Sequence, residues 1–385
     1  MKMSFLAVGL GAGVFLPGCS HMSPQHQTEA QIPPTAVRAL EAVGQKLAPD
    51  PHMSIFQVGL ERAGLVVTGE VERVEFKQEA MQALERAGVK VQDQVEVLPE
   101  KELGDQVYGM VCLSVASGRE HPDHKAEMGT QILMGDVVRI WKGSRHWFYV
   151  QSRDGYLSWV ESGAIHRCTR EQADAWERAE QVMVTAFDER VLEEPALEAR
   201  PVSDVVMGDR LKVAGTNNGW MKVELPDGRS GWLAKEAATN YAAWKASRSA
   251  TAENIERTAT MFLGRPYLWG GTSPKGLDCS GFAKFVFFLN GVDLYRNASE
   301  QARQGAAVPL ADNFSKLKKG DLLFFGWPGR RGQPEWVTHV GIYLGDRRFI
   351  QSAQRVKISS LDPASPIYDA GHARGLLAAR RVLGE

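Results

Sequence analysis

The sequence predicts an α+β protein built from several small domains in a row. The chain has 385 residues, which is more than one compact domain usually holds. Its middle carries an internal repeat of short β-patterned runs, which indicates two similar β-barrels. The segment 245–385 changes from helical periodicity to a series of strands, and helices followed by an antiparallel sheet are typical of an α+β domain.

The composition is ordinary for a globular protein. Hydrophobic residues make up 44% and charged residues 24% of the chain, values that exclude global disorder, a collagen-like repeat and a polytopic membrane protein. The chain has 45 Lys and Arg against 46 Asp and Glu, and no domain-sized basic block stands out. We therefore expect no nucleic-acid partner, because nucleic-acid binding needs a basic surface.

Residues 1–18 have the layout of an export signal. Lys2 precedes an apolar run from Phe5 to Phe15, and small residues follow up to Gly18. The apolar run is shorter than the roughly 20 residues that a membrane-spanning helix needs. The sequence therefore predicts an exported protein.

The run Leu16-Pro17-Gly18-Cys19 resembles a bacterial lipobox, although Pro17 is an unusual residue at its position. The resemblance implies that Cys19 becomes the lipidated first residue of the mature chain and anchors it to a membrane. Ser20 suits sorting to the outer membrane, so the expected location is the periplasmic side, with the lipid anchor in the outer membrane. The alternative is a plain secretory signal that is cleaved nearby.

Two segments separate the signal from the repeat. Residues 19–53 are rich in Gln, Pro and Ser, carry one helical run at 36–47, and are interpreted as a tether. Residues 54–100 predict a small α/β module that resembles the BON-type module of periplasmic proteins. Its expected elements are strands at 55–60 and 65–71, a helix at 72–87 and a strand at 89–97.

The internal repeat defines the middle of the chain. Met134-Gly135-Asp136 recurs as Met207-Gly208-Asp209, 73 residues later, and three further shared motifs keep the same displacement. Short β-patterned runs joined by Gly, Asp and Ser turns predict a small barrel in each copy, and the spacing of the Trp and Asp-Gly turns resembles bacterial SH3 domains. The copies cover 104–168 and 178–240, and a charged helix at 171–179 lies between them.

Residues 245–385 form the last predicted domain. An amphipathic helix at 253–263 ends at Gly264, and a second helix, at 280–290, follows a glycine-rich loop. Four strands are expected after these helices, at 322–325, 337–344, 348–352 and 356–358.

Cys279 is the candidate nucleophile of this domain. It immediately precedes the apolar second helix, in the run Gly276-Leu277-Asp278-Cys279-Ser280-Gly281-Phe282. The helix dipole and the unpaired N–H groups at a helix amino terminus stabilise a thiolate, and the same N–H groups can hold an oxyanion. The position therefore predicts a reactive cysteine.

His339 is the candidate base, since it is the only histidine of this domain besides His372. It lies in a β-patterned run that ends in a hairpin turn at Gly345-Asp346. A turn centred on Gly345 would place Gln351 opposite His339 on the same face of the hairpin. We therefore expect the polar side chain of Gln351 to orient the imidazole.

The remaining cysteines and histidines give weaker signals. Cys112 and Cys168 bracket the first barrel, and the sequence leaves open whether they form a disulfide or stay as two free thiols. The run His121-Pro122-Asp123-His124 has two histidines but no third ligand at a zinc-site spacing, so no metal site is expected.

Four motifs stand out in the last domain, namely Pro266-Tyr267-Leu268-Trp269-Gly270-Gly271, Leu277-Asp278-Cys279-Ser280-Gly281-Phe282, Lys319-Gly320-Asp321-Leu322-Leu323-Phe324-Phe325 and His339-Val340-Gly341-Ile342-Tyr343-Leu344-Gly345. Together they resemble the NlpC/P60 family of papain-like cell-wall peptidases, and the likeness covers nearly all of 250–385. With the two SH3-like copies ahead of it, the chain is similar to the γ-D-glutamyl-L-diamino acid endopeptidases, also called dipeptidyl-peptidase VI-like enzymes. The implied fold is α+β, with a papain-like catalytic domain behind two SH3-like barrels and the small amino-terminal module.

The resemblance implies cysteine attack on the amide between γ-D-glutamate and the diamino acid of peptidoglycan stem peptides or muropeptides, without a metal or cofactor. Cys279 would be the nucleophile, His339 the base and Gln351 the third residue, a position at which the family often has histidine. Residues of this chain that match positions lining the family's substrate pocket are Tyr267, Trp269, Asp278, Ser280 and Arg296.

A segment of the first barrel, Asp154-Gly155-Tyr156-Leu157-Ser158-Trp159, resembles one whose tyrosine closes the pocket around the free amino-terminal alanine of the substrate in the related endopeptidases. Tyr156 is that tyrosine here, and the second copy has Arg229 instead. The family's acidic residue just before a Thr-Gln pair would fall at Gly129, so the nearest acid, Glu127, or another carboxylate would bind the ammonium. This implies a preference for peptides with a free N-terminal L-Ala.

Two other functions stay open. One is a wall-acting amidase or D,L-endopeptidase that acts on intact peptidoglycan. The other is a non-catalytic wall-binding lipoprotein whose peptidase domain has decayed, against which the intact Cys279 and His339 argue. The sequence also leaves open whether the diamino acid is diaminopimelate or lysine.

Overall fold

A computed structural model describes residues 32–61, 66–310, 312–329 and 336–384. The expected export signal and the lipidation site at Cys19 lie outside these residues. No helix of the described residues is long and apolar enough to span a membrane.

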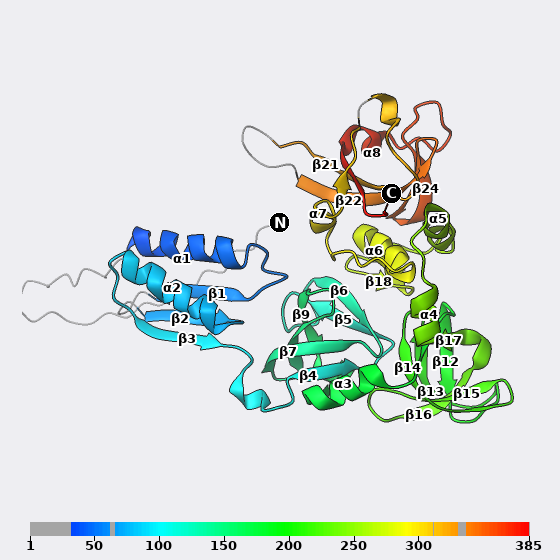
Figure 1. Cartoon of the computed structure of the whole chain (residues 1–385), viewed down its shortest axis with the longest axis horizontal. Coiled ribbons are helices and arrows are strands. Elements are labelled where there is room, and N and C mark those ends of the chain that lie inside the picture. The colour runs from blue at the N-terminus through cyan, green and yellow to red at the C-terminus, as the bar shows by residue number, and fades with distance from the viewer. Residues whose placement is uncertain (1–31, 62–65, 311, 330–335, 385) are drawn as a thin grey trace, which may run out of the picture.

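The amino-terminal module is a three-stranded sheet covered by two helices (Figure 1). The strands lie in the order β1-β2-β3, with β2 antiparallel to β1 and parallel to β3. The helix α2 connects β2 to β3, which allows the parallel pairing. The elements are α1 (Pro34–Leu47), β1 (Phe56–Glu61), β2 (Val66–Val71), α2 (Val74–Arg86) and β3 (Gln92–Val97).

The helix α1 belongs to this module, so the expectation of a tether up to residue 53 is wrong for 34–53. Ala36, Leu40 and Val43 recur at helical spacing on one face of α1 and are buried. Ala36 and Leu40 share a hydrophobic core with Leu84 of α2 and Val67 of β2. The segment 48–55 is therefore held at both ends, by α1 and by β1.

The two barrels have the same strand topology, which confirms the repeat. The strand order is β6-β5-β9-β8-β7-β4-β10 in the first barrel and β13-β12-β16-β15-β14-β11-β17 in the second. Each strand of the first barrel stands at the same place in this order as its repeat-related strand in the second. The helix α3 (Arg170–Arg178) joins them, and it begins at a capping box formed by Thr169 and Gln172.

The strands of the two barrels are short, as the turn spacing predicts. Those of the first are β4 (Tyr108–Val111), β5 (Val115–Arg119), β6 (Met128–Leu133), β7 (Val137–Ser144), β8 (Trp147–Gln151), β9 (Leu157–Glu161) and β10 (Ile165–Cys168). Those of the second are β11 (Gln181–Val184), β12 (Asp188–Leu192), β13 (Pro201–Val206), β14 (Arg210–Asn217), β15 (Trp220–Glu224), β16 (Ser230–Ala234) and β17 (Ala238–Asn240).

The carboxy-terminal domain packs helices against a six-stranded sheet of order β20-β25-β21-β22-β23-β24. The apolar helix α6 lies in its core, where Phe282 and Val286 are fully buried with Val340 and Ile342 of β22. The sequence did not predict β20, β25, α4, α7 or α8. The helices are α4 (Tyr241–Ser247), α5 (Ala252–Thr260), α6 (Cys279–Leu289), α7 (Ala298–Gln301) and α8 (Ala370–Gly375). The strands are β18 (Thr272–Ser273), β19 (Gly276–Leu277), β20 (Ala306–Ala307), β21 (Leu322–Trp327), β22 (Trp336–Gly345), β23 (Arg348–Ala353), β24 (Arg355–Ser360) and β25 (Leu376–Arg381).

The carboxy-terminal domain sits on the two barrels, and the amino-terminal module lies beside the first barrel (Figure 1). Gln131 of β6 fastens the first barrel to β18. Its side-chain oxygen accepts hydrogen bonds from the Thr272 amide (3.0 Å) and the Ser273 hydroxyl (2.9 Å), and its carbonyl accepts one from the Thr272 hydroxyl (2.8 Å). This contact places β6 of the first barrel next to β18, which in turn packs against α6.

Candidate active site

Cys279 is the first residue of α6, and its side chain is buried, with 8% of the residue exposed. The cap of the helix is Asp278, whose side chain accepts a hydrogen bond from the Gly281 amide at 2.7 Å. This bond stabilises the start of the helix at this residue. The sulfur is thus held at a fixed point at the helix terminus.

The pKa of the Cys279 thiol is raised to about 12, chiefly by burial and secondly by the charge of Asp278, while the N–H groups of Val340 and Ser280 and the charge of Arg296 oppose the shift. In the substrate-free state desolvation therefore outweighs the stabilisation of a thiolate by the helix terminus and favours the neutral thiol. The Val340 amide acts on the sulfur, so the strand that carries His339 passes beside the predicted nucleophile.

His339 and Gln351 are in contact, but not through the predicted register. The imidazole Nε2 lies 2.5 Å from the Gln351 Oε1 atom. The hairpin pairs Ile342 with Ile350 and has an irregularity before Gly345. Gln351 is therefore opposite Gly341, two residues beyond His339. Its side chain reaches His339 as a diagonal neighbour on the same face of the sheet. The turn geometry, which the sequence does not specify, shifted the register by two residues.

The orientation of the Gln351 amide fixes the tautomer of His339. The amide nitrogen donates to the Ser359 hydroxyl (2.8 Å) and to the Asp369 carboxylate (3.2 Å). A carboxylate only accepts hydrogen bonds, so the amide NH2 must face Asp369 and the amide oxygen must face the imidazole. The His339 Nε2 therefore carries the proton, and Nδ1 is left with a lone pair.

His372 is a second histidine at this site, and its part was not predicted. Its ring centroid lies 4.5 Å from that of His339, and its Nδ1 atom lies 2.8 Å from the Asp369 Oδ2 atom. The pKa of His339 is lowered to about 4, chiefly by burial and secondly by the charge of His372. His339 is therefore neutral at physiological pH. The only signal in the sequence was that the domain has two histidines.

Asp278 and Arg296 form a buried ion pair under the first turn of α6. The Arg296 Nη2 atom lies 2.5 Å from one Asp278 oxygen, and Nη1 lies 3.2 Å from the other. Nη1 also donates to the Ser280 hydroxyl at 2.9 Å. The three side chains thus hold the loop that carries Cys279, because a buried charge needs such partners to stay ionised.

A cleft of about 580 Å³ opens above Cys279 and extends to the first barrel. The predicted pocket residues all line this cleft together with Cys279. They are Tyr156, Glu127, Tyr267, Trp269, Asp278, Ser280 and Arg296.

Glu120, rather than Glu127, is the carboxylate beside Tyr156. The Tyr156 hydroxyl donates to the Glu120 Oε1 atom at 3.4 Å, whereas Glu127 accepts a hydrogen bond from the Trp269 indole at 2.7 Å. A Cβ atom on Gly129 would lie 2.7 Å from Glu120 Oε1 and 2.8 Å from the Tyr156 oxygen. Glu120 therefore occupies the space that a side chain at 129 would fill.

The sequence held a signal for Glu120 in the β5–β6 hairpin. The Glu120 amide donates to the Glu127 carbonyl, and Gly118 pairs with Thr130. Reading this hairpin as a register would have placed Glu120 next to position 129. His52 also lines the cleft, although it falls in the segment interpreted as a tether.

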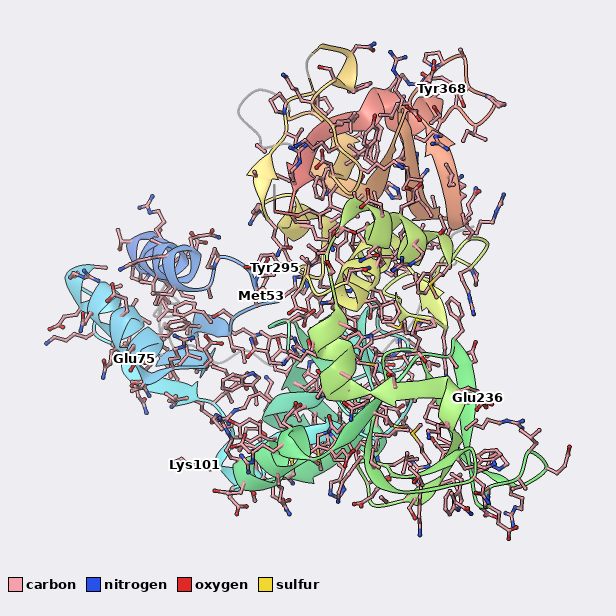
Figure 2. The ribbon with its side chains drawn as sticks, turned by 45° about the vertical axis from the view of Figure 1, so that its right-hand side comes forward. Met53, Glu75, Lys101, Glu236, Tyr295 and Tyr368 are labelled. Carbon is pink, nitrogen blue, oxygen red and sulfur yellow. The ribbon has the colours of Figure 1, made fainter. Side chains whose placement is uncertain are left out.

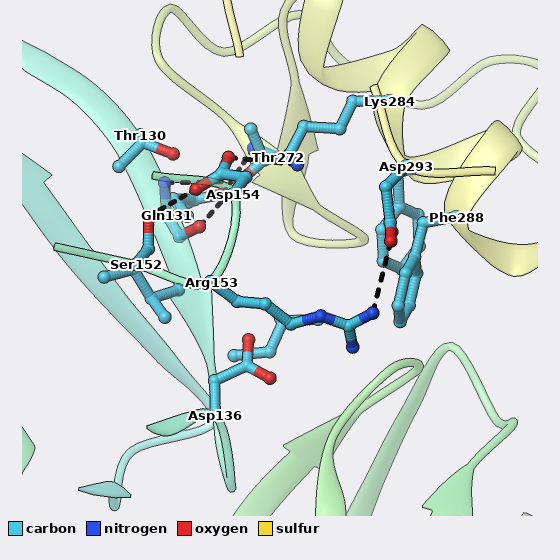
Figure 3. Close-up of a pocket in the computed structure, with 13 residues that line it drawn as sticks. Thr130, Gln131, Asp136, Ser152, Arg153, Asp154, Thr272, Lys284, Phe288 and Asp293 are labelled. Atoms are coloured by element: carbon cyan, nitrogen blue, oxygen red, sulfur yellow. Dashed lines mark hydrogen bonds and ion pairs between the residues drawn. The ribbon is translucent and has the colours of Figure 1, made fainter. Parts of the chain in front are cut away.

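A second, smaller cavity, of about 130 Å³, lies between the first barrel and α6 (Figure 3). Lys284 of α6 lies 3.0 Å from the buried carboxylate of Asp154, and Arg153 lies 3.2 Å from Asp293. None of the predicted catalytic residues is among the described residues around it. It is a charged junction between two domains, separate from the cleft at Cys279.

The other two described cysteines, Cys112 and Cys168, are buried free thiols, which answers the question that the sequence left open. Among the residues with described positions, no group of three or more His, Cys, Asp or Glu could hold a metal ion.

Comparisons with protein families agree with this arrangement. The NlpC/P60 family matches residues 264–373, the bacterial dipeptidyl-peptidase Sh3 domain matches 118–165 and the bacterial SH3 domain matches 190–238. The chain is 29% identical to dipeptidyl-peptidase 6 of Lysinibacillus sphaericus, over 67% of this chain and 93% of that one. It is 28% identical to a γ-D-glutamyl-L-lysine dipeptidyl-peptidase of Bacillus cereus, over 67% of this chain and 76% of the relative.

A further relative matches a shorter part of the chain. The γ-D-glutamyl-L-lysine dipeptidyl-peptidase of Bacillus subtilis is 42% identical over 136 residues, and the match spans 42% of that protein's length. Among solved structures, an NlpC/P60 family protein of Bacillus cereus superimposes with a TM-score of 0.61 at 26% identity, over 72% of this chain and all of that one. The chain therefore carries an NlpC/P60 family peptidase domain preceded by two bacterial SH3 domains.

Proposed function

We propose that the protein hydrolyses the amide bond between γ-D-glutamate and a diamino acid in peptidoglycan-derived peptides that begin with a free L-Ala. The relatives named for γ-D-glutamyl-L-lysine dipeptidyl-peptidase activity support this bond type. Peptides released from the wall, rather than stems still attached to glycan, are the substrates that a free amino terminus implies. Turnover or recycling of wall peptides is the corresponding role.

One observation carries the proposal, namely that a single cleft joins Cys279 to the Glu120 carboxylate and the Tyr156 hydroxyl of the first barrel. A carboxylate beside a hydroxyl at one end of the cleft suits an ammonium group. A thiol at the other end suits the carbonyl carbon of the bond to be cut. A peptide bound along the cleft would thus present its amino terminus to one domain and its scissile bond to another.

The chemistry follows from the neutral state of the two reacting groups. The His339 Nδ1 atom takes the proton from Cys279 as the sulfur attacks the γ-glutamyl carbonyl carbon, and Gln351 holds the imidazole by its Nε2–H. The N–H groups of the first turn of α6 stabilise the oxyanion. The amine of the diamino acid leaves with the proton, and water then hydrolyses the thioester with His339 again as base.

The test compares L-Ala-γ-D-Glu-diaminopimelate with its N-acetylated form, and the lysine peptide with its own N-acetylated form. Mass spectrometry should show release of L-Ala-γ-D-Glu from the free peptides, with kcat/KM at least about tenfold lower after acetylation, because an acetylated nitrogen strands the Glu120 carboxylate. Cys279→Ser should remove nearly all hydrolysis while the protein stays folded. Equal rates on the free and acetylated peptides would refute the selection of a free amino terminus.

A wall-acting amidase or D,L-endopeptidase is tested in the same assay. Intact sacculi and soluble muropeptides are digested side by side, and the proposal expects products only from the soluble peptides. Products from sacculi alone would favour the wall-acting alternative.

We also propose export and lipidation at Cys19, which rest on the sequence Leu16-Pro17-Gly18-Cys19 alone. Metabolic labelling with palmitate should label the wild-type chain and leave Cys19→Ala unlabelled. Membrane fractionation of the two chains gives the location, with the labelled form expected in the outer-membrane fraction. Equal labelling of both chains would contradict lipidation at this cysteine.

A further inference from the structure

The segment 49–53 runs from the amino-terminal module onto the first barrel and is held there by backbone contacts. The Leu157 amide donates to the His52 carbonyl at 2.7 Å, and the Gln151 side chain donates to the Met53 carbonyl at 3.0 Å. Asp50 closes the turn, since its carbonyl accepts from the Met53 amide and its carboxylate from the His52 amide. Figure 2 shows Met53 at the inner side of the module, where it meets the rest of the molecule.

These contacts place the His52 side chain on the two groups that would bind the substrate's amino terminus. Its ring stacks on the Tyr156 ring, with centroids 5.2 Å apart and planes 9° apart. Its Nε2 atom lies 3.4 Å from the Glu120 Oε2 atom, while Tyr156 donates to the other oxygen of Glu120. His52 thus borders the cleft at the end opposite Cys279.

The charges around His52 are mostly negative. The bond to Glu120 raises the pKa of His52, and the same bond lowers the pKa of Glu120. Asp50 lies 3.5 Å from the His52 Nδ1 atom and also acts on Glu300 of α7, whose pKa is raised first by burial and further by Asp50. The imidazole therefore separates Glu120, inside the cleft, from two further carboxylates beyond it.

We propose that His52 is a specificity-determining residue that closes the cleft beyond the amino-terminal residue of the substrate. This rests on the proposed function of the cleft. A residue added before L-Ala would have to enter the space filled by the imidazole. The amino-terminal module, and not the barrel alone, would then limit the substrate to two residues ahead of the bond that is cut.

The test measures binding of two peptides by calorimetry, L-Ala-γ-D-Glu and Gly-L-Ala-γ-D-Glu, neither of which contains the bond to be cut. The wild-type chain should bind the extended peptide at least about tenfold more weakly. His52→Ala should reduce this penalty to about threefold or less, because the vacated space lets the added ammonium reach Asp50 and Glu300. The two hydrogen bonds that hold this segment on the barrel survive in this variant, since they use the main-chain carbonyls of His52 and Met53.

Two further variants separate a specific effect from a structural one. His52→Phe keeps a stacked ring over Tyr156 and should keep the penalty. His166→Ala, an exposed histidine of β10 on the same barrel, should behave as the wild type. If the wild type cleaves the free substrate and His52→Ala leaves the penalty unchanged, the role of His52 is refuted and the proposed function stands. If the wild type neither binds L-Ala-γ-D-Glu nor cleaves the free substrate, both proposals fall.

Discussion

Cys279 and His339 form a neutral pair at rest, because burial raises the pKa of the thiol to about 12 and lowers that of the imidazole to about 4. In a thiolate–imidazolium pair the order of the two pKa values would be reversed. The proton must therefore move during the reaction, as in general-base catalysis, rather than before it. This difference can be measured without a substrate.

We predict that alkylation of Cys279 by iodoacetamide accelerates steadily from pH 6 to pH 9. Only the thiolate reacts, and its fraction grows with pH throughout this range when the pKa lies above it. Peptide mapping by mass spectrometry follows Cys279, and Cys168, whose pKa burial raises to about 11, is the internal control. A rate that is already constant between pH 6 and pH 9 would indicate a preformed thiolate.

For hydrolysis, kcat/KM should be lost only as the pH falls through about 4, where His339 gains its proton.

We predict that Gln351→Ala slows turnover far less than His339→Ala. The alanine removes the acceptor that holds the Nε2–H of the imidazole, but the base remains, whereas losing the base costs about 10²–10⁴-fold. Steady-state kcat of the two variants gives the order, and Ser359→Ala, which removes one of the two partners of the Gln351 amide nitrogen, is the milder control. Equal losses would mean that Gln351 does more than orient His339.

At the scale of elements, the β5–β6 hairpin delivers the carboxylate that faces Tyr156. Glu120 directly follows β5, and the position that the resemblance implied, Gly129, stands on β6. The hairpin brings both to the same point, so a carboxylate from either strand can serve it. The nearest acid to this position along the sequence is Glu127, which instead binds Trp269.

We predict that Glu120→Ala lowers kcat/KM for the free peptide by about 10- to 100-fold, the usual loss for a hydrogen bond to a charged group. The double variant Glu120→Ala with Gly129→Glu should recover part of this loss, because the new side chain enters the space that Glu120 has left. Glu127→Ala is the matched control and should have a smaller effect. Failure of the double variant together with a large loss in Glu127→Ala would assign the ammonium to Glu127.

The same element scale shows what the sequence could predict. The helix at Cys279, the strand of His339 and the barrel strands follow from periodicity and turn residues, and the structure contains them. The partner of His339 was found through a register that is off by two residues, because an irregularity before Gly345 depends on packing and not on the local pattern. The predicted contact between Gln351 and His339 is nevertheless present, because the two residues are diagonal neighbours on one face of the sheet.

At the scale of the whole molecule, the cleft has residues from three domains. His52 comes from the amino-terminal module, Glu120 and Tyr156 from the first barrel, and Cys279 from the last domain. The sequence predicted the domains through the 73-residue repeat and the four motifs. It could not place His52 in the cleft, because no periodicity within a domain reports how separate domains dock.

We predict that Lys284→Met raises KM for the free peptide several-fold and changes kcat less. Lys284 compensates Asp154, a buried carboxylate that also accepts from the Tyr156 amide at 3.3 Å, so the turn carrying Tyr156 should shift when the charge is lost. Steady-state kinetics separate the two constants. Lys319→Met, which breaks the more exposed pair with Glu256, should leave both constants unchanged. A fall in kcat alone would mean that the junction acts on the chemistry.

The burial of the sulfur at the start of α6 also bears on chemical durability. Oxidants such as peroxide attack thiolates, and they oxidise neutral thiols slowly. All three described cysteines, Cys112, Cys168 and Cys279, are buried, with pKa values raised chiefly by desolvation. An enzyme that forms its thiolate only while a peptide is being cut would be protected from sulfenic acid formation whenever no substrate is bound. It would therefore stay active without a reducing partner.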